Sequence, residues 1–442
     1  MGDLGPGDDV RNPGDGASWR IERLMGCGAQ GCVYKATGLG GQVAVKWFLD
    51  RWAAPSHRTA IARLASSAAP SSRFVWPTAV VECATAPGFG YVMPLVPTPP
   101  FVEMAEVMTR RAVPSFTALV RGCVALAHAI ATLHQAGFCY RDLSHTNLMI
   151  DPVDGDIRIF DVDNVVPITR SISPTVGGTR GYMPPEALTG RVEPGPRADL
   201  HALAVLVFIL LANHHPLVGR REFEFPVLDD AGYVDLYGRN ARFIFNRKRD
   251  ENRPDPARHG NAIAYWNIFP DHLKLRFHQA FDDGLFVVSK RVTAASWVST
   301  LQTLADGIHL CPACGAENYD DPLAGASPLC WSCKHPRAER LLLRGAQTRV
   351  ALHPGRPLVP ATTIRPRHLT GATNATGPPL AVVEPAADDP VRLVLRNCAD
   401  HAWRSVSAGH EAPIMVKPGD RLPLVAGTWV DFGEGGPMEV IH

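Results

Sequence analysis

The residues at 140–147 read Tyr-Arg-Asp-Leu-Ser-His-Thr-Asn, and they follow an apolar segment at residues 116–134 with helical spacing. This spacing predicts a buried core helix, which Gly137 would end. The polar stretch would then lie in a loop directly after the helix. A lone aspartate in a loop is usually a turn residue. Asp142, however, has Arg141 before it and Asn147 after it, and this combination favours a catalytic aspartate.

Other landmarks precede and follow this loop in a definite order. Gly26, Gly28 and Gly31 lie between alternating apolar residues, a pattern that predicts a hairpin whose tip could approach a triphosphate closely. Lys46 ends an apolar strand, and Asp161 follows Ile157-Arg-Ile-Phe. A glycine pattern alone is often only a turn, and a lysine there is often a surface residue. Together with Asp142 and Asn147, the ordered set favours a phosphate-transfer fold.

Over about residues 18–305, the chain resembles the eukaryotic-like protein kinases of bacteria. The resemblance implies an α+β, bilobal fold with an N-lobe at 18–96 and a C-lobe at 97–306, including an insertion at about 218–278. It implies a serine/threonine kinase that uses ATP and Mg²⁺ to phosphorylate a protein, including itself. Asp142 would orient the acceptor hydroxyl, Lys46 and the glycines would hold phosphates, and Asn147 and Asp161 would bind Mg²⁺. The remaining nucleotide contacts would be Val33, Ala44, Leu95 and the gatekeeper Met93.

Three departures from the kinase pattern affect the expected activity. No glutamate lies between Lys46 and Val81, although the related kinases pair this lysine with a helix glutamate. Either another acid serves Lys46, the nearest in sequence being Asp50 and Glu82, or the lysine is unpaired until nucleotide binds. Ser144 replaces a catalytic-loop lysine, which predicts slow transfer. Asp163 replaces a glycine, which predicts a locked loop. A pseudokinase scaffold that binds nucleotide and partners is the alternative.

The segment Gly178–Glu186 matches the substrate platform of protein kinases and favours a protein substrate. Asp199 would anchor the catalytic loop, and Arg291 would pair with Glu186. The preceding activation segment offers hydroxyls that could be phosphorylated, at Thr169, Ser171, Ser173 and Thr175.

Two Cys-x-x-Cys pairs, separated by fifteen residues, are typical of a four-cysteine zinc ribbon at 307–338. The ligands would be Cys311, Cys314, Cys330 and Cys333. Four cysteines leave no open coordination position, so the spacing indicates a structural metal. A redox-active dithiol pair is the alternative.

The two ends of the chain have different predicted structures. Residues 339–442 alternate short apolar runs with Pro/Gly turns, which predicts a β-sandwich. This segment faintly resembles a forkhead-associated domain, although Arg365 stands where a phosphothreonine-binding serine would be. The Gly- and Asp-rich residues 1–17 predict a disordered leader.

Composition narrows the partners and the compartment. The formal net charge is +1, which gives no reason to propose nucleic acid or an anionic membrane. The strongest apolar run, Ala202–Ala212, is too short to span a bilayer. The six cysteines outside the ribbon are scattered, which favours a reducing, cytoplasmic compartment. The domain order resembles stress-operon kinases, which implies a PPM-type phosphatase and a von Willebrand A-type protein as partners.

Overall fold

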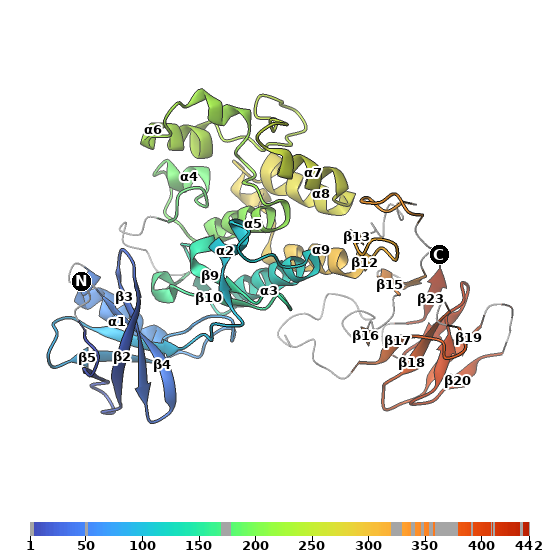
Figure 1. Cartoon of the computed structure of the whole chain (residues 1–442), viewed down its shortest axis with the longest axis horizontal. Coiled ribbons are helices and arrows are strands. Elements are labelled where there is room, and N and C mark those ends of the chain that lie inside the picture. Colours follow the sequence, from blue (N-terminus) through green and yellow to red (C-terminus); the bar gives the residue numbers. More distant parts are fainter. Residues whose placement is uncertain are drawn as a thin grey trace. The chain divides into compact units, whose positions relative to one another are not determined.

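The computed structural model describes residues 4–48, 52–168, 178–319, 329–336, 341–345, 349–352, 357–358, 379–389, 392–407, 409, 412–433 and 436–441. These form two compact units, Met1–Asn267 with Lys274–Leu301, and Ile268–Leu273 with Gln302–His442 (Figure 1). The four candidate phosphorylation sites at 169–175, Asp50 and Arg365 lie outside the described residues. The predicted boundaries at 306 and 338 stay predictions.

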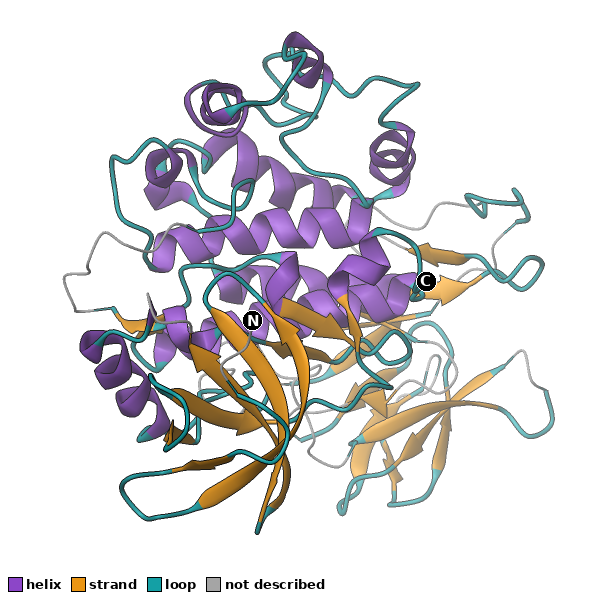
Figure 2. Cartoon of the chain, turned by 60° about the vertical axis from the view of Figure 1, so that its left-hand side comes forward, coloured by secondary structure: helices purple, strands orange, loops and turns teal. Residues whose placement is uncertain are grey.

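The first unit begins with six antiparallel strands that close into a barrel in the order β1-β2-β3-β4-β6-β5. They are β1 (Asp9–Arg11), β2 (Ser18–Cys27), β3 (Gly31–Gly38), β4 (Gly41–Phe48), β5 (Ala79–Cys83) and β6 (Gly90–Pro94), with α1 (Pro55–Ala65) following β4 in sequence. Alternate side chains point into the barrel, where Ile21, Tyr34 and Val45 are buried. Figure 2 shows these strands below the helices of the same unit.

The expected disordered leader is wrong for the described residues 4–17. Val10 on β1 pairs with Trp19 on β2 and with Cys83 on β5, so this short strand joins the barrel. Leu4 and Val10 are both buried in the barrel core. The surrounding glycines and aspartates dominate the local composition, but two apolar side chains in the right register suffice to order the segment.

Most of the remaining first unit is helical. Its helices are α2 (Met104–Met108), α3 (Phe116–Gln135), α4 (Pro185–Leu188), α5 (Pro196–Ala212) and α6 (Asp230–Val234), together with most of α7 (Gly260–Ile268), α8 (Asp271–His278) and α9 (Ala294–Gly307), whose remaining residues are assigned to the second unit. Shorter helical turns are η2 (His145–Asn147), η3 (Val162–Asn164), η4 (Arg220–Glu224), η5 (Asp235–Arg239), η6 (Gln279–Asp283) and η7 (Val288–Lys290). Two small sheets connect the helices. One consists of β7 (Val102–Glu103), β9 (Leu148–Ile150) and β10 (Ile157–Ile159), and the other pairs β8 (Phe138–Cys139) with β11 (Val166–Pro167).

The two central helices are α3 and α5. The Ser115 side chain caps α3 by accepting a hydrogen bond from the Ala118 amide, which is a common arrangement at the start of a helix. By length and composition α3 could cross a membrane, but many of its apolar side chains are buried inside the protein. In α5 every residue from Ala198 to Ala212 is buried, so this largely apolar helix is enclosed on all sides.

The predicted insertion at about 218–278 contributes aromatic side chains that pack around Phe208 of α5, with ring centroids 5.7 Å away for Phe243 and 4.9 Å away for Phe277. Trp266 stacks on Phe245 at 4.2 Å within the same cluster. The insertion therefore shares the hydrophobic core of the helical region.

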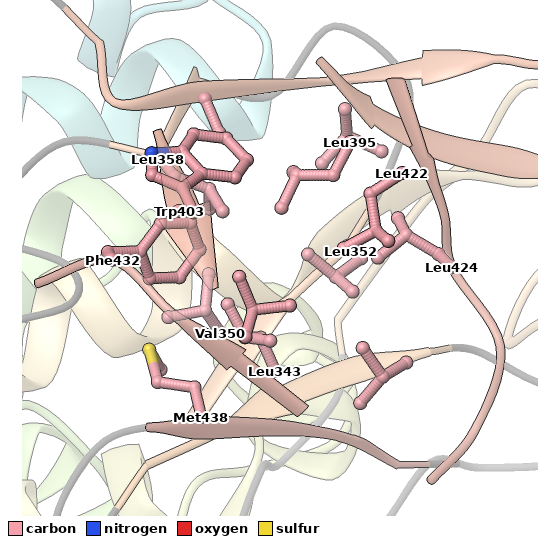
Figure 3. Packing of buried hydrophobic residues seen from close by; sticks show 14 of the residues in the cluster. Leu343, Val350, Leu352, Leu358, Leu395, Trp403, Leu422, Leu424, Phe432 and Met438 are labelled. Carbon is pink, nitrogen blue, oxygen red and sulfur yellow. The ribbon is translucent and has the colours of Figure 1, made fainter. Parts of the chain in front are cut away.

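The second unit contains a small hairpin and two larger sheets. The hairpin joins β12 (Ile308–Leu310) to β13 (Glu317–Tyr319). The first sheet has the order β15-β14-β23-β22-β19-β20, from β14 (Leu342–Arg344), β15 (Arg349–Ala351), β19 (Trp403–Val406), β20 (Ile414–Val416), β22 (Trp429–Asp431) and β23 (Met438–Ile441). The second has the order β16-β17-β18-β21, from β16 (Pro357–Leu358), β17 (Ala381–Pro385), β18 (Leu393–Asn397) and β21 (Arg421–Pro423). Both sheets contribute to one apolar cluster around Trp403, Phe432 and Leu395 (Figure 3).

Replacement of Val10 by alanine should destabilise the first unit. The side chain is fully buried, so losing its two methyl groups should lower the free energy of unfolding by about 2 kcal/mol. Arg11→Ala, at the exposed neighbouring position, is the matched control. Equal thermal midpoints for the two variants would contradict the role given to β1.

Candidate active site and metal centre

The strand register brings the predicted nucleotide-binding residues onto one face of the barrel sheet. Gly26 on β2 lies opposite Val33 on β3, Val33 lies opposite Lys46 on β4, and Lys46 lies opposite Tyr91 on β6. Two residues along, Ala44 lies opposite Met93. Because side chains alternate along a strand, Ala44 and Lys46 point to the same side. Leu95 lies in the segment that follows β6, and the predicted ligands Asn147 and Asp161 lie further along the chain.

The surroundings of the three predicted loop glycines differ, so glycine is present at each position for a different reason. A Cβ atom at Gly31 would lie 2.2 Å from the Trp47 carbonyl oxygen, so β3 can approach β4 only with glycine there. At Gly26 no atom lies within 4 Å of the same ideal position, and at Gly28 only the Gly31 carbonyl oxygen does, at 4.0 Å. The loop tip is therefore open, as a phosphate-binding loop requires.

A disulfide bond between Cys27 and Cys32 closes this loop. These residues lie opposite each other at the end of the β2–β3 hairpin, and the Gly28 amide donates to the Gly31 carbonyl inside the turn. The sequence analysis described the six cysteines outside the predicted ribbon as scattered, and it did not predict this disulfide. Register explains the difference, because pairing depends on which residues face each other across the hairpin.

Lys46 is buried in an ion cluster with two aspartates. Its Nζ atom lies 2.5 Å from Asp161 Oδ1 and 2.9 Å from Asp163 Oδ2. Burial disfavours the charged ammonium, but the negative charges of Asp163 and Asp161 outweigh it and raise the pKa of Lys46 above its ordinary value. The lysine therefore stays a fixed cation at neutral pH.

The partner of Lys46 is thus another acid, which was one of the two alternatives left open. Glu82, one of the acids considered, is paired with Arg58 of α1 instead. Asp161 adopts a left-handed backbone with φ of 52°, a conformation uncommon outside glycine and often found at functional sites. This turn directs both aspartates of the Asp-Val-Asp segment toward the lysine.

Asp142 is held by a residue that the sequence analysis did not single out. Its Oδ1 atom accepts hydrogen bonds from the backbone amide and the hydroxyl of Thr179, each at 2.7 Å. The Asn147 amide nitrogen donates to the Asp142 carbonyl at 2.9 Å, and so closes the catalytic loop on itself. Thr179 lies in the predicted platform segment, but no pattern in a single sequence marks it as a ligand of Asp142.

The predicted anchors of this loop are confirmed. Asp199 of α5 is almost fully buried and accepts from the backbone amides of Tyr140 and Arg141, at 2.8 Å and 2.7 Å. Arg291 lies 2.7 Å from Glu186, which fixes the end of the platform segment. These contacts position Asp142 from two sides. At Ser144, the side chain is buried and its hydroxyl meets that of Thr146 at 2.8 Å, so this position presents no cation.

The oxygen atoms near Lys46 suit a hard divalent cation. The side-chain Nδ2 atom of Asn147 donates to the Asp142 backbone carbonyl, and its Oδ1 atom, which accepts from the Thr146 hydroxyl at 3.4 Å, is the oxygen that would act as a ligand. The Phe160 backbone amide donates to the Asn147 backbone carbonyl at 2.9 Å, which brings the Asp161 segment next to this loop. The second oxygen of Asp163 is buried and has no hydrogen-bond partner within the described part of the chain. Carboxylate and amide oxygens are the ligands that Mg²⁺ takes, so the residues fit the ion.

The four ribbon cysteines converge in the second unit. Their sulfur atoms all lie within 4.8 Å of one another, with 3.7 Å between Cys311 and Cys333 and 3.8 Å between Cys314 and Cys330. Tetrahedral Zn²⁺ with bonds of about 2.3 Å places its sulfurs about 3.8 Å apart, so the cluster fits this ion. Each Cys-x-x-Cys pair forms a tight turn, called a knuckle below. In each knuckle the residue after the second cysteine, Gly315 or Lys334, has a left-handed backbone.

Asn318 joins the two knuckles, and spacing alone did not predict it. The side chain is buried, donates to Cys330 Sγ at 3.5 Å and accepts from the Trp331 amide at 3.1 Å. A donor to a ligating sulfur orients that ligand and tunes the metal site. Only the folded hairpin brings Asn318 to the second knuckle.

Comparisons with known proteins find similarity to protein kinases in the first part of the chain. Residues 19–231 match the family model of the protein kinase domain. CBL-interacting protein kinase 4 of Oryza sativa subsp. japonica is 28% identical over 228 residues, which cover 47% of this chain and 50% of the relative. Serine/threonine-protein kinase PknL of Mycobacterium tuberculosis is 33% identical over 94 residues, covering 20% and 23%. CBL-interacting serine/threonine-protein kinase 7 of Arabidopsis thaliana is 29% identical over 136 residues, covering 28% and 31%.

Residues 19–231 are therefore similar to protein kinase domains. The whole chain spans half the length or less of these relatives. The predicted ribbon and β domain lie outside the residues that the family model matches.

Acidification should loosen the platform segment through His215. Its Nε2 atom bonds the Gly181 carbonyl at 2.9 Å, and its Nδ1 atom accepts from the Leu217 amide at 3.1 Å, which requires a neutral ring. Burial lowers the pKa of His215 to about 4. The unfolded ring has a pKa near 6.5, so the unfolded state binds more protons below that pH, and stability is lost as pH falls from 6.5 toward 4.

Because of His215, the free energy of unfolding should be about 2 kcal/mol lower at pH 5 than at pH 7.5. Denaturant unfolding of the protein and of His215→Gln at both pH values measures the effect, and the variant should show the smaller difference. His401→Gln, at a half-exposed ring, is the control. Identical pH dependence in all three proteins would refute the assignment.

The purified protein should contain one zinc ion per chain by elemental analysis. Cys314→Ser should lose it, because three thiolates bind far more weakly than four. Asn318→Ala should retain the fold but bind zinc roughly 10- to 100-fold more weakly in a chelator competition. Cys398 lies outside the cluster, so the control variant Cys398→Ser should bind zinc as tightly as the wild-type protein. A metal-free wild-type protein would exclude a structural zinc site.

Proposed function

We propose that the chain is an ATP- and Mg²⁺-dependent protein kinase that transfers the γ-phosphate to serine or threonine side chains, including its own. The observation that carries this proposal is the pairing of the buried Lys46 ammonium with Asp161 at 2.5 Å. It joins the two halves of a phosphate-transfer site that lie 115 residues apart in sequence. The kinase domain match and the serine/threonine kinases among the relatives support the same activity.

Each polar residue of the site has a defined task in this proposal. Lys46 supplies a permanent positive charge for the phosphates beside the open glycine loop. Asp142 orients the acceptor hydroxyl and can receive its proton, and the two bonds from Thr179 hold the carboxylate in place. Positioning of this kind is the main protein contribution to phosphoryl transfer.

Asn147 and Asp161 would hold Mg²⁺, which neutralises charge on the phosphates when it is bound. Ser144 offers no cation near Asp142, where related serine/threonine kinases carry a lysine. Loss of one such charge lowers turnover by roughly 10²- to 10³-fold. We therefore expect a slow enzyme.

The second candidate function is a nucleotide-binding scaffold without efficient transfer. The buried Ser144 and the absence of a carboxylate on α1 favour it. The formed contacts of Lys46, Asp142 and Asp161 favour catalysis, because a scaffold does not need a precisely held acceptor base.

The remaining features belong to the same proposal. The bilobal division, the structural zinc ribbon, and a forkhead-like β-sandwich in the second unit complete the domain scheme. The proposed location is the cytoplasm, and the proposed partners are a PPM-type phosphatase and a von Willebrand A-type protein. The two sheets around one apolar cluster support the sandwich, and the sulfur distances support the ribbon.

Incubation of the purified protein with γ-labelled ATP and Mg²⁺ tests the proposal. The wild-type protein should label itself or a generic substrate such as casein. Asp142→Asn and Asp161→Ala should reduce labelling by at least about 10³-fold, as expected for groups that act on the transferred phosphate. Arg11→Ala, at an exposed position away from the site, should label normally.

A thermal-shift measurement with ATP and Mg²⁺ accompanies the labelling. Equal label in the wild type and both aspartate variants would mean that the site does not catalyse transfer. An ATP-dependent stabilisation without label in any protein would instead support the scaffold function.

A further inference from the structure

The buried lysine of the sheet needs a fixed counterion, and α1 cannot supply one. The helix contains no aspartate or glutamate, and its charged residues are Arg58 and Arg63. Its buried side chains are Ile61 and Leu64, and Arg58 is paired with Glu82 of β5. A buried ammonium without a partner is costly, so the counterion must come from another element.

Asp161 and Asp163 both contact Lys46, but they differ in environment. The Asp161 side chain is 39% exposed, whereas that of Asp163 is fully buried. Asp161 is also the residue expected to bind Mg²⁺, so its carboxylate is shared between the lysine and the ion. Asp163 lies within the helical turn η3, between the buried residues Val162 and Asn164. Its carboxylate is therefore the better placed of the two to remain on Lys46 in every state.

We propose that Asp163 is a positioning residue that holds Lys46 in place for nucleotide binding, a task that falls to a helix carboxylate in related kinases. This inference rests on the proposed function for its catalytic meaning. The contact it describes is 2.9 Å between Asp163 Oδ2 and Lys46 Nζ, and it spans 117 residues of sequence. The catalytic cation is thereby fixed by the metal-binding loop itself.

The arrangement has a consequence for regulation. Where a helix carboxylate holds the lysine, movement of that helix can assemble or dismantle the site. Here both anchors lie on the segment 161–163, and the α1 ion pair with Glu82 does not touch the lysine. Changes at the surface of α1 should therefore leave the lysine in place.

The test compares Asp163→Asn, Asp163→Glu and the α1 control Arg58→Ala. Asp163→Asn preserves the size of the side chain but removes its charge. It should lower kcat/KM for ATP by roughly 10- to 100-fold, mainly through KM, because the lysine loses a charged hydrogen bond. Asp163→Glu should recover part of the loss, and Arg58→Ala should equal the wild type.

A second measurement follows Lys46 directly and does not require catalysis. The protein is labelled with a lysine-acylating reagent across pH 7 to 10, and mass spectrometry reports modification at position 46. Removal of the Asp163 charge should move the labelling profile of Lys46 to lower pH, while Arg58→Ala should leave it unchanged. A purely structural role for Asp163 would not shift this profile.

The outcomes separate this inference from the proposed function. A shifted Lys46 profile in Asp163→Asn with no phosphotransfer by any protein would sustain the inference and refute the kinase activity. An Asp163→Asn protein that matches Arg58→Ala in both measurements would overturn the inference. If Asp163→Asn does not fold, Asp163→Ser, which also removes the charge, decides the question in the same two measurements, and wild-type behaviour in both would also overturn the inference.

Discussion

The site depends on one buried ammonium and the two carboxylates that surround it. Lys46 belongs to the barrel sheet, whereas Asp161 and Asp163 follow β10 in the helical region. Their contact is electrostatic and largely removed from water, so it is stronger than a surface ion pair and costly to break from one side. This cluster joins the barrel sheet, which carries the glycine loop and the Val33–Lys46 row, to the segment 161–163 of the helical region.

The sequence alone predicted the parts of the site whose chemistry lies in a local motif. Asp142, Asn147 and Asp161 could be named because they occur in a fixed order along the chain, and Asp199 and Arg291 because the resemblance to protein kinases assigns roles to these positions. The partner of Lys46 could not be predicted, since it lies 117 residues away and depends on how the loop after β10 turns. The left-handed backbone at Asp161 creates that turn, and no single-sequence pattern marks it.

The remaining differences between expectation and structure also arise from long-range register. Cys27 and Cys32 form a disulfide because they face each other across the hairpin, and Val10 orders the N-terminal segment because it meets two strands at once. Thr179 and Asn318 complete their sites from segments that local spacing does not connect to them. The cysteine cluster could be predicted, because the two cysteines of each pair are only three residues apart and their local spacing fixes their geometry.

The buried carboxylate at position 163 also bears on how small molecules could recognise this protein. A compound that binds only after the segment 161–163 has turned over would first have to separate Asp163 from Lys46. Breaking a buried pair from one side costs about 3–5 kcal/mol, which corresponds to a loss of affinity of at least about 100-fold. Inhibitors that bind the conformation in which Asp163 contacts Lys46 should therefore be favoured. Inhibitors that require the segment 161–163 to move away from Lys46 should bind weakly.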